Sequence, residues 1–346
     1  MLDLQPETSS PAALTDASPA SPRAHAPRRD LLIDVVRGLA IVLVALGHTN
    51  QGVARRGWWG TSNIGVHLDL AIYAFHMPAF FFVSGIFIKR SVSKRGERGY
   101  TLEKLRTMIY PYFLWAFIFA GATIPFARFM AQTTPPWRTF LFTLFTGAAP
   151  WFLPTLFFAL MLGMLFRNLP MPLFFIAAAS LSLWGPETDV MFFDRGLHHL
   201  VFLVAGMWVG ASFKKLEAIP VWTSALAALL LAVVIYLVTA SPFGLSPYLF
   251  IPLGLLGTLM LMLVANCMGH SPTARALAWT GAASFGIFLM SSFPQGAGRE
   301  LLVRILHTTE PWLQLIFPTI LAVVIPAWLY HQRKLLHIQW MFTWPF

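Results

Sequence analysis

The chain has 346 residues, of which 57% are hydrophobic and only 11% are charged, and its mean hydropathy is +0.67. A soluble domain has about 25% charged residues, so this composition excludes an ordinary soluble enzyme. It predicts an all-α bundle that crosses a lipid bilayer several times. The net charge of +10 does not indicate a nucleic-acid partner, because the basic residues cluster in short segments between apolar runs, where they set membrane topology. The single Cys267 excludes an intramolecular disulfide framework.

Residues 1–30 are rich in Pro, Ala and Ser and have no apolar periodicity, which is typical of a disordered tail. Acidic residues come first in this segment, and the basic residues Arg23, Arg28 and Arg29 come last, directly before the first apolar run. This order is the reverse of a secretory signal peptide. We therefore expect a cytoplasmic tail.

The first apolar run, Leu31 to Asn50, carries Asp34, Arg37 and His48. A bilayer-spanning helix needs roughly 20 residues, and each ionisable group at mid-membrane costs on the order of 2.5–3.5 kcal/mol or more. Arg37 and His48 are eleven residues apart, almost three helical turns, so both lie on one face roughly 16 Å apart along the axis. Asp34 lies one turn before Arg37. An ion pair of Asp34 with Arg37 at the membrane interface is an alternative, but it leaves His48 unexplained.

The second apolar run, residues 64–88, carries Asp69 and His76, with Pro78 two residues after the histidine. Proline cannot donate a backbone hydrogen bond, so we expect a kink here, next to a buried histidine and a cavity. The alternative is that His76 is a core histidine bonded to a neighbouring helix.

Ten apolar segments are expected to cross or enter the membrane, with a re-entrant or interfacial stretch at 135–149 and a cytoplasmic C-terminal tail at 332–346. With both termini in the cytoplasm, more Lys and Arg residues fall on the inner side than on the outer side, as the positive-inside rule requires. The predicted segments are 31–50, 64–88, 107–127, 150–167, 171–185, 196–213, 220–240, 245–267, 276–294 and 311–331.

The motifs IDVVRGLAIVLVALGH (33–48) and FHMPAFFFVSG (75–85) resemble the acyltransferase-3 family of membrane acyltransferases, and within it the sugar O-acetylases of the fucose 4-O-acetylase type. Three weaker matches follow in the order expected for the family's motifs, and SFGIFLM (284–290) resembles the family's late helix. One position departs from the pattern: the late motif is often followed by a histidine, where this chain has Ser291. The weaker matches are residues 103–115, 150–158 and 202–210.

The resemblance implies transfer of an acyl group, usually acetyl, from cytoplasmic acyl-CoA to a hydroxyl of a carbohydrate, glycolipid or cell-surface polysaccharide. It also implies a bacterial-type inner membrane, a transmembrane acyltransferase bundle over 31–331 and no bound cofactor or metal. A histidine suits the task of general base at neutral pH. His48 is expected to act as that base or as an acyl-carrying nucleophile. The catalytic set is then His48, Arg37, Asp34 and His76.

The expected donor contacts are Arg37, Lys104 and Arg106, which match CoA phosphates by charge. The alternative for Lys104 and Arg106 is that the basic loop Lys89 to Arg106 only sets the membrane topology and binds no ligand. Trp151 and Asp69 are expected to contact the acceptor, although Trp151 also suits an interfacial aromatic belt.

Three other readings stay open at this level. The adjacent His198 and His199, with Asp194, allow a metal site, which the thin carboxylate count disfavours. A transporter or flippase for a polar metabolite would use the same intramembrane residues as a proton relay. A scaffold or receptor subunit would not depend on His48 for activity.

Overall fold

The computed structural model describes residues 30–123, 138, 141, 150–188, 190–241 and 246–345. Within these residues the chain forms only helices and connecting turns, as the composition predicts. The predicted tail before Asp30 lies outside the described residues, and so does the predicted re-entrant stretch 135–149 apart from two positions. Residues 31–346 belong to one compact unit.

Among the described residues, six apolar helical stretches are long enough to cross a bilayer, so the chain is a multi-pass membrane protein. These stretches are α1 (Leu31–Arg55), α2 (Ile64–Tyr73) with α3 (His76–Ile86), α9 (Met191–Val209) with the turn Gly210–Ala218, α10 (Val221–Ala240), the turn Pro247–Leu249 with α11 (Phe250–Met268), and α15 (Pro311–His331). The remaining helices are α4 (Ile88–Lys104), the π-helical turn Leu105–Ile109, α5 (Tyr110–Thr123), α7 (Phe152–Leu165), α8 (Met171–Trp184), α12 (Pro272–Ala282), α13 (Ser284–Met290), α14 (Ser292–Arg304) and the 3-10 turn Gln339–Met341.

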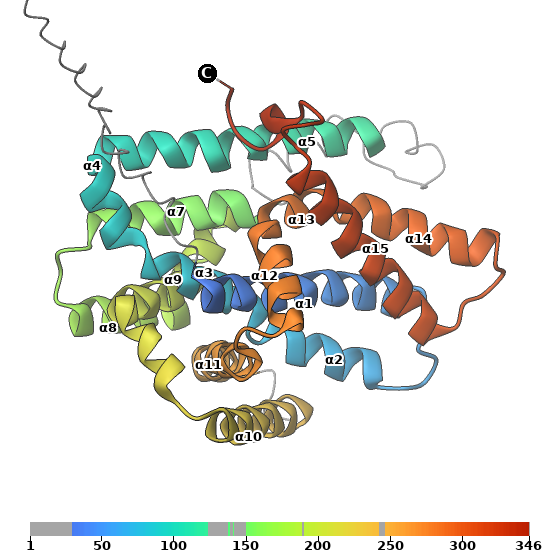
Figure 1. Ribbon diagram of the computed structural model, residues 1–346, viewed down its shortest axis with the longest axis horizontal. Coiled ribbons are helices and arrows are strands. Elements are labelled where there is room, and N and C mark those ends of the chain that lie inside the picture. The colour runs from blue at the N-terminus through green and yellow to red at the C-terminus, as the bar shows by residue number, and fades with distance from the viewer. Residues whose placement is uncertain are drawn as a thin grey trace, which may run out of the picture. The chain divides into compact units, whose positions relative to one another are not determined.

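Helix α1 runs through the middle of the helical unit, and α12 crosses it (Figure 1). A Cβ atom at Gly38 would overlap the backbone carbonyl of Leu277, and one at Gly281 would overlap the carbonyl of Asp34. These glycines therefore let the two backbones touch, as small residues do in membrane bundles. The crossing holds the first half of α1 in place.

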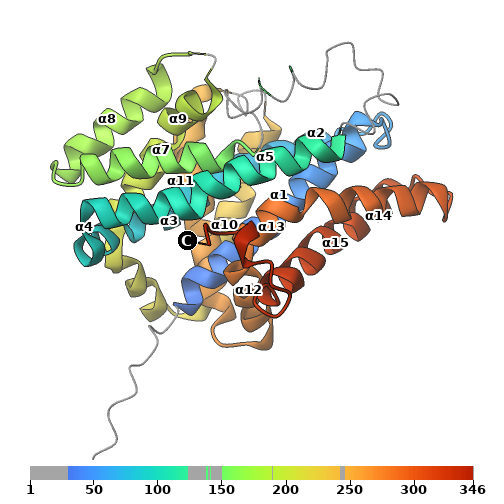
Figure 2. The same cartoon turned by 90° about the horizontal axis from the view of Figure 1, so that it is seen from above.

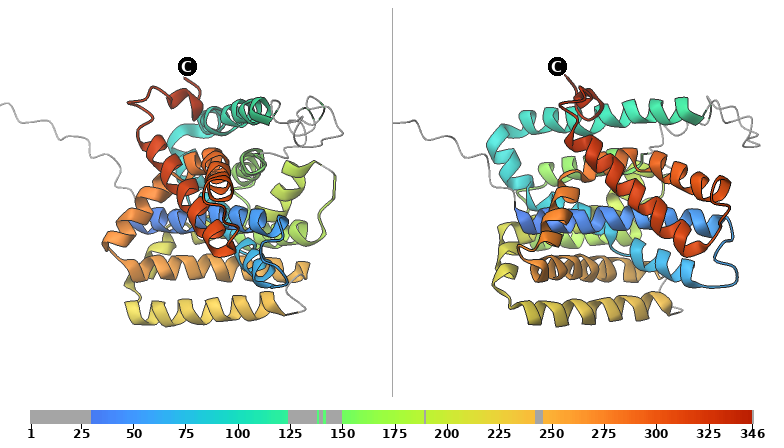
Figure 3. Two further views of the ribbon diagram at one scale, coloured as in Figure 1. Left: turned by 90° about the vertical axis from the view of Figure 1, so that its right-hand side faces the viewer. Right: turned by 45° about the vertical axis from the view of Figure 1, so that its right-hand side comes forward.

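A second close crossing joins α3 to α9 by the same means. A Cβ atom at Gly85 would overlap the carbonyl of Leu203, and one at Gly206 would overlap the carbonyl of Phe82. Helix α7 packs against α9, and α5 lies across this side of the unit when it is seen from above (Figure 2). At the opposite edge α10 is the outermost helix (Figure 3), and its exposed leucines, such as Leu229 and Leu230, suit contact with lipid.

The predicted kink in the second apolar run is a full break between α2 and α3. The helix ends at Tyr73, Phe75 has a non-helical φ of −142°, and α3 begins at His76. Pro78 then falls in the first turn of α3, where a missing backbone N–H removes no helical hydrogen bond. The break at Ala74 and Phe75 lies one turn before the proline, where a carbonyl freed by Pro78 is expected, so the predicted kink is present in the form of a complete break.

Two predicted segments differ in form from the structure. The expected single span 276–294 is divided at Ala283 (φ −98°, ψ 4°), where α12 ends and α13 starts in a new direction, because α12 is held across α1 by Gly281. The expected basic loop, Lys89 to Arg106, is helical apart from Gly96, whose φ of 71° bends it. Lys, Arg and Glu are good helix formers, so this charged segment continues as helix.

The C-terminal segment packs against α5. The indole Nε1 of Trp115 donates to the carbonyl of Met341 at 2.9 Å, and the backbone N–H of Trp344 donates to the carbonyl of Arg106 at 3.1 Å. Phe342 is buried in the same cluster. The segment predicted as a tail is thus part of the packed unit up to residue 345.

Candidate active site

The first half of α1 carries Asp34 and Arg37, which lie close together as an i, i+3 pair. Arg37 Nη1 is 3.7 Å from Asp34 Oδ1, and the arginine side chain is 34% exposed. The guanidinium carbon also lies 5.8 Å from the centre of the Phe87 ring. The ion pair given as the alternative at this position is present, and about a third of the Arg37 side chain remains exposed.

Lys104, at the end of α4, lies near Arg37. Burial lowers the pKa of the Lys104 ammonium, Glu103 opposes this shift, and the positive charges of Arg95 and Arg37 add to it. Lys104 Nζ is 3.9 Å from a carboxylate oxygen of Glu103 and 5.3 Å from the centre of the Tyr100 ring. Two of the three predicted donor-binding residues, Arg37 and Lys104, are thus near enough to interact electrostatically.

The third predicted donor contact, Arg106, lies one short turn further on. Its side chain is exposed, and its backbone carbonyl accepts the hydrogen bond from Trp344. The segment around it is a π-helical turn between α4 and α5. Arg106 is therefore a surface charge two residues after Lys104 in the chain.

His48 lies in the second half of α1, and its ring is exposed. Its Nδ1 is 3.4 Å from the hydroxyl oxygen of Tyr73, and the two rings meet nearly edge to face at a centroid distance of 6.5 Å. A Cβ atom at Gly47 would press on the Tyr73 ring, so this glycine lets the end of α2 approach α1. The hydroxyl of Tyr73 is the nearest polar partner of the predicted base.

His76 is buried and opens α3. Its Nδ1 is 2.7 Å from the backbone carbonyl of Ile72, and a carbonyl can only accept, so Nδ1 carries the proton. Its ring meets Tyr73 edge to face at 4.6 Å. One ring nitrogen of the buried His76 is thus held by the end of α2, and its ring contacts Tyr73, which in turn contacts His48.

Asp69 precedes Tyr73 by one turn of α2. The side chains of Asn50 and Gln51 of α1 act as hydrogen-bond partners of its carboxylate, while the buried Oδ1 atom has no partner within 3.5 Å among the described residues. Asn50 is held in place because its amide donates to the carbonyl of Gly65 at 2.7 Å. A buried acceptor without a donor costs free energy, so Asp69 is poised to accept a hydrogen bond.

Trp151 stands just before α7 and faces the start of α9. The guanidinium carbon of Arg195 lies 4.4 Å from the centre of the Trp151 ring, and His199 lies 6.0 Å from that ring. Arg195 also interacts electrostatically with Tyr73. The predicted acceptor contact Trp151 is thus linked through Arg195 to the His48 side of the bundle.

The adjacent His198 and His199 bind different partners. Nδ1 of His198 is 3.0 Å from the carbonyl of Ser182, and Nδ1 of His199 is 2.8 Å from the carbonyl of Arg195. Within the described ranges there is no group of three or more His, Cys, Asp or Glu side chains suited to a metal ion.

A protein-family model described as an acyltransferase domain matches residues 30–331, most of the chain. The chain belongs to the acyltransferase-3 family. This confirms the resemblance carried by the motifs around Arg37, His48 and His76. Together with the apolar spans, it identifies the chain as a multi-pass membrane protein of an acyltransferase family.

The acyltransferase is also similar to the Nodulation protein NolL of Sinorhizobium fredii (strain NBRC 101917 / NGR234). The two are 30% identical over 114 residues, which are 33% of this chain and 30% of that protein. The similarity therefore covers less than a third of NolL. No solved structure matches the chain.

Ser291, where the acyltransferase departs from the family pattern, is buried between α13 and α14. One turn later, Gln295 donates from Nε2 to the hydroxyl of Thr49 at 2.6 Å, and Thr49 directly follows His48. Thr319 of α15 donates to the same hydroxyl at 2.9 Å. The helix that carries Ser291 is thus fixed to α1 beside His48.

Tyr73 and Arg195 also belong to this site, although neither was predicted from the sequence. Tyr73 lies four residues after Asp69 and three before His76, so the i, i+3 and i, i+4 spacing of helical neighbours was a usable signal. Arg195 lies more than a hundred residues away from Tyr73 in the chain, and no local spacing relates them.

Proposed function

We propose that this acyltransferase moves an acyl group, by preference acetyl, from cytoplasmic acyl-CoA to a hydroxyl of a carbohydrate, glycolipid or cell-surface polysaccharide. The proposal is supported mainly by the positions of two polar groups along α1. Arg37, in the first half of α1, lies near Lys104 of α4. His48, roughly 16 Å further along the helix axis, lies beside Tyr73 of α2. Cations suit a phosphate-bearing donor, and an imidazole suits a hydroxyl that must lose its proton.

On the donor side, the planar guanidinium of Arg37 matches phosphate oxygens by two parallel hydrogen bonds, and Lys104 adds a compact positive charge. Arg106, on the surface, raises the local concentration of the anionic donor through long-range attraction. The donor's pantetheine arm would then extend along α1 and present the thioester near His48. Acyl-CoA is a co-substrate here, and the proposal needs no resident cofactor.

On the acceptor side, His48 removes the hydroxyl proton as the oxygen attacks the thioester carbonyl. The new carbon–oxygen bond forms, the carbon–sulfur bond breaks, and the proton passes from the imidazole to the departing CoA thiolate. Trp151, steadied by Arg195, offers a flat surface for a sugar ring, and Asp69 accepts a hydrogen bond from a second hydroxyl. A two-step route, in which His48 carries the acyl group, uses the same residues.

Tyr73 orients the base in this scheme. With Nδ1–H of His48 donating to the Tyr73 oxygen, Nε2 keeps the lone pair that takes the proton. We therefore expect Tyr73→Phe to lower kcat about threefold to tenfold, the value of one hydrogen bond, while the KM for acyl-CoA stays unchanged. Steady-state kinetics on purified enzyme measure both parameters, and a KM change without a kcat change would contradict the orienting role.

Membrane orientation is part of the proposal. About ten spans in a bacterial inner membrane, with both termini in the cytoplasm, place the Arg37 end of α1 toward the donor. A reporter fused after Phe346 is expected to read cytoplasmic, and one inserted after Thr309 in the full chain is expected to read periplasmic. The opposite pair of signals would reverse the orientation and with it the assignment of donor and acceptor sides.

The test of the proposed function uses membranes from cells that express the enzyme, supplied with acetyl-CoA labelled on the acetyl group. Label is expected in base-labile material of the glycolipid and polysaccharide fractions, because an ester is cleaved by base. No label above membranes without the enzyme, with the protein inserted, would contradict an acetyl transfer to these acceptors.

A further inference from the structure

A group of arginines surrounds the end of α1, beyond His48. Arg55 and Arg56 belong to α1 and the turn after it, and Arg299 comes from α14. The guanidinium of Arg299 lies against Gly52, where an added Cβ atom would overlap it. Gly52 follows His48 by one helical turn on nearly the same face, roughly 6 Å along the axis. Arg299 therefore reaches the surface of α1 next to the predicted base.

Arg299 differs from an ordinary solvated arginine. Its Nε is buried and has no hydrogen-bond partner, and it forms no ion pair with any residue that the structure describes. Burial and the charges of Arg56 and Arg55 lower the pKa of Arg299, and Glu300 only partly opposes them. By contrast, Arg304 on the same helix is 78% exposed.

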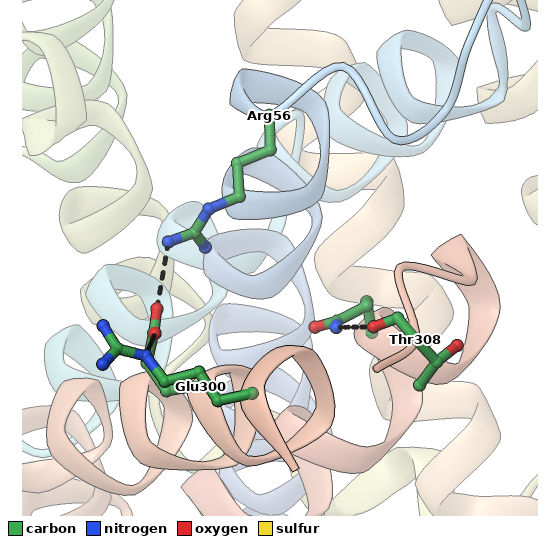
Figure 4. A network of polar contacts seen from close by, with 5 residues as sticks. Arg56, Glu300 and Thr308 are labelled. Carbon is green, nitrogen blue, oxygen red and sulfur yellow. Dashed lines mark hydrogen bonds and ion pairs between the residues drawn. The ribbon is translucent and has the colours of Figure 1, made fainter. Parts of the chain in front are cut away.

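Two carboxylates act on this group in the described part of the chain: Asp69 interacts electrostatically with Arg55, and both oxygens of Glu300 are engaged by Arg56 and Arg304. Glu300 Oε1 lies 3.4 Å from Nη2 of Arg56, and Oε2 lies 2.8 Å from Nε of Arg304 (Figure 4). Arg55 acts electrostatically on both His48 and Tyr73, so the excess positive charge extends to the base. Like charges gathered in this way are stabilised by a bound anion.

We infer that Arg299 and Arg55, with Arg56 beside them, bind an anionic group of the acceptor, a phosphate or a carboxylate, one helical turn from the hydroxyl that is acylated. This inference rests on the proposed function, since it names the class of acceptor that the same site takes. Guanidinium groups bind both kinds of anion through paired hydrogen bonds. The acceptor is thus an acidic glycan or a sugar linked through phosphate, with its charge close to its reactive hydroxyl.

The experiment measures labelled acetyl transfer by the purified full-length enzyme in lipid vesicles to three acceptors. These are a glucose oligosaccharide, the matching oligosaccharide with glucuronate, and the same sugar joined to a lipid through phosphate. Wild type is expected to prefer the charged acceptors, and the better of the two identifies the anion. Arg299→Gln is expected to raise KM for that acceptor roughly tenfold or more, the value of a charged hydrogen bond, without changing KM for acetyl-CoA or transfer to the neutral acceptor.

The matched control is Arg304→Gln, which removes an arginine from the same helix and the same Glu300 but leaves the surface of Gly52 untouched. It is expected to leave all three KM values unchanged. Arg299→Lys keeps the charge without the planar fork, so its KM is expected to lie between those of wild type and Arg299→Gln. Equal effects of Arg299→Gln and Arg304→Gln, or an equal loss on charged and neutral acceptors, would overturn the anion site.

A binding measurement separates this inference from the proposed function. Thermal stabilisation by the glucuronate oligosaccharide, without acetyl-CoA, is expected for wild type and is expected to be lost in Arg299→Gln. Stabilisation with no transfer by wild type to any acceptor would contradict the acetyl transfer and leave the anion site standing. Transfer by wild type without any preference for charged acceptors would contradict the anion site and leave the acetyl transfer standing.

Discussion

His48→Ala is expected to lower acyl transfer by roughly 10²–10⁴-fold, the usual contribution of a positioned general base. The protein should still insert and fold, because His48 is exposed on α1 and its nearest polar contact is the long 3.4 Å approach to Tyr73. The loss is expected mainly in kcat, since the imidazole acts on the proton that moves in the transition state. The measurement is transfer of labelled acetyl groups to base-labile ester by membranes with equal amounts of enzyme.

A control for this variant is His270→Ala, which removes an exposed imidazole from the turn between α11 and α12. It should transfer label like wild type. Comparing both variants by detergent gel filtration shows whether each is folded. If His48→Ala kept near-normal turnover, His48 would be neither the base nor an acyl carrier, and the site would have to be sought elsewhere in the bundle.

Arg37→Ala is expected to raise the KM for acyl-CoA by about tenfold to a hundredfold, because a hydrogen bond to a charged group contributes roughly 1.5–3 kcal/mol. The KM for the acceptor should change little, since the acceptor contacts lie near the other half of α1. Removal of the guanidinium also leaves Asp34 without the partner 3.7 Å away. A modest loss of stability, within about 1 kcal/mol for a partly exposed pair, is therefore expected alongside the kinetic effect.

Two further variants make the Arg37 result specific. Arg37→Lys keeps the charge but loses the paired hydrogen bonds, so its KM for acyl-CoA should be intermediate. Arg98→Ala removes an exposed arginine from α4 and should leave that KM unchanged. An unchanged KM in Arg37→Ala, or an equal change in Arg98→Ala, would show that Arg37 does not bind the donor.

His48→Ala and Arg37→Ala are expected to impair different steps of the reaction, because the two residues lie in different halves of α1. The loss in His48→Ala should not be overcome by more acyl-CoA, whereas the loss in Arg37→Ala should shrink as acyl-CoA is raised. This difference follows from the roughly 16 Å between the two side chains, which is too far for one to replace the other. A double variant should show both defects, with nearly additive free energies.

Local periodicity made much of this protein predictable. The low charge content identifies a membrane protein, and the motifs around Arg37, His48 and His76 identify the family that the comparison confirms. The common face of Arg37 and His48 follows from 3.6 residues per turn and needs no knowledge of the fold. The broken second span was also foreseeable, because the break at Ala74 and Phe75 lies one turn before Pro78.

Only the tertiary structure decided which residues of distant segments meet. Helix crossings at Gly38 and Gly281, and the close approach of Tyr73 at Gly47, depend on backbone contacts between elements far apart in the chain. The same holds for Arg195 over Trp151 and for Arg299 against Gly52. The sequence alone determined the membrane class, the family and the polar face of α1, because these depend on composition and helical repeat. The surroundings of His48 depend on how helices pack, which no spacing within one helix can encode.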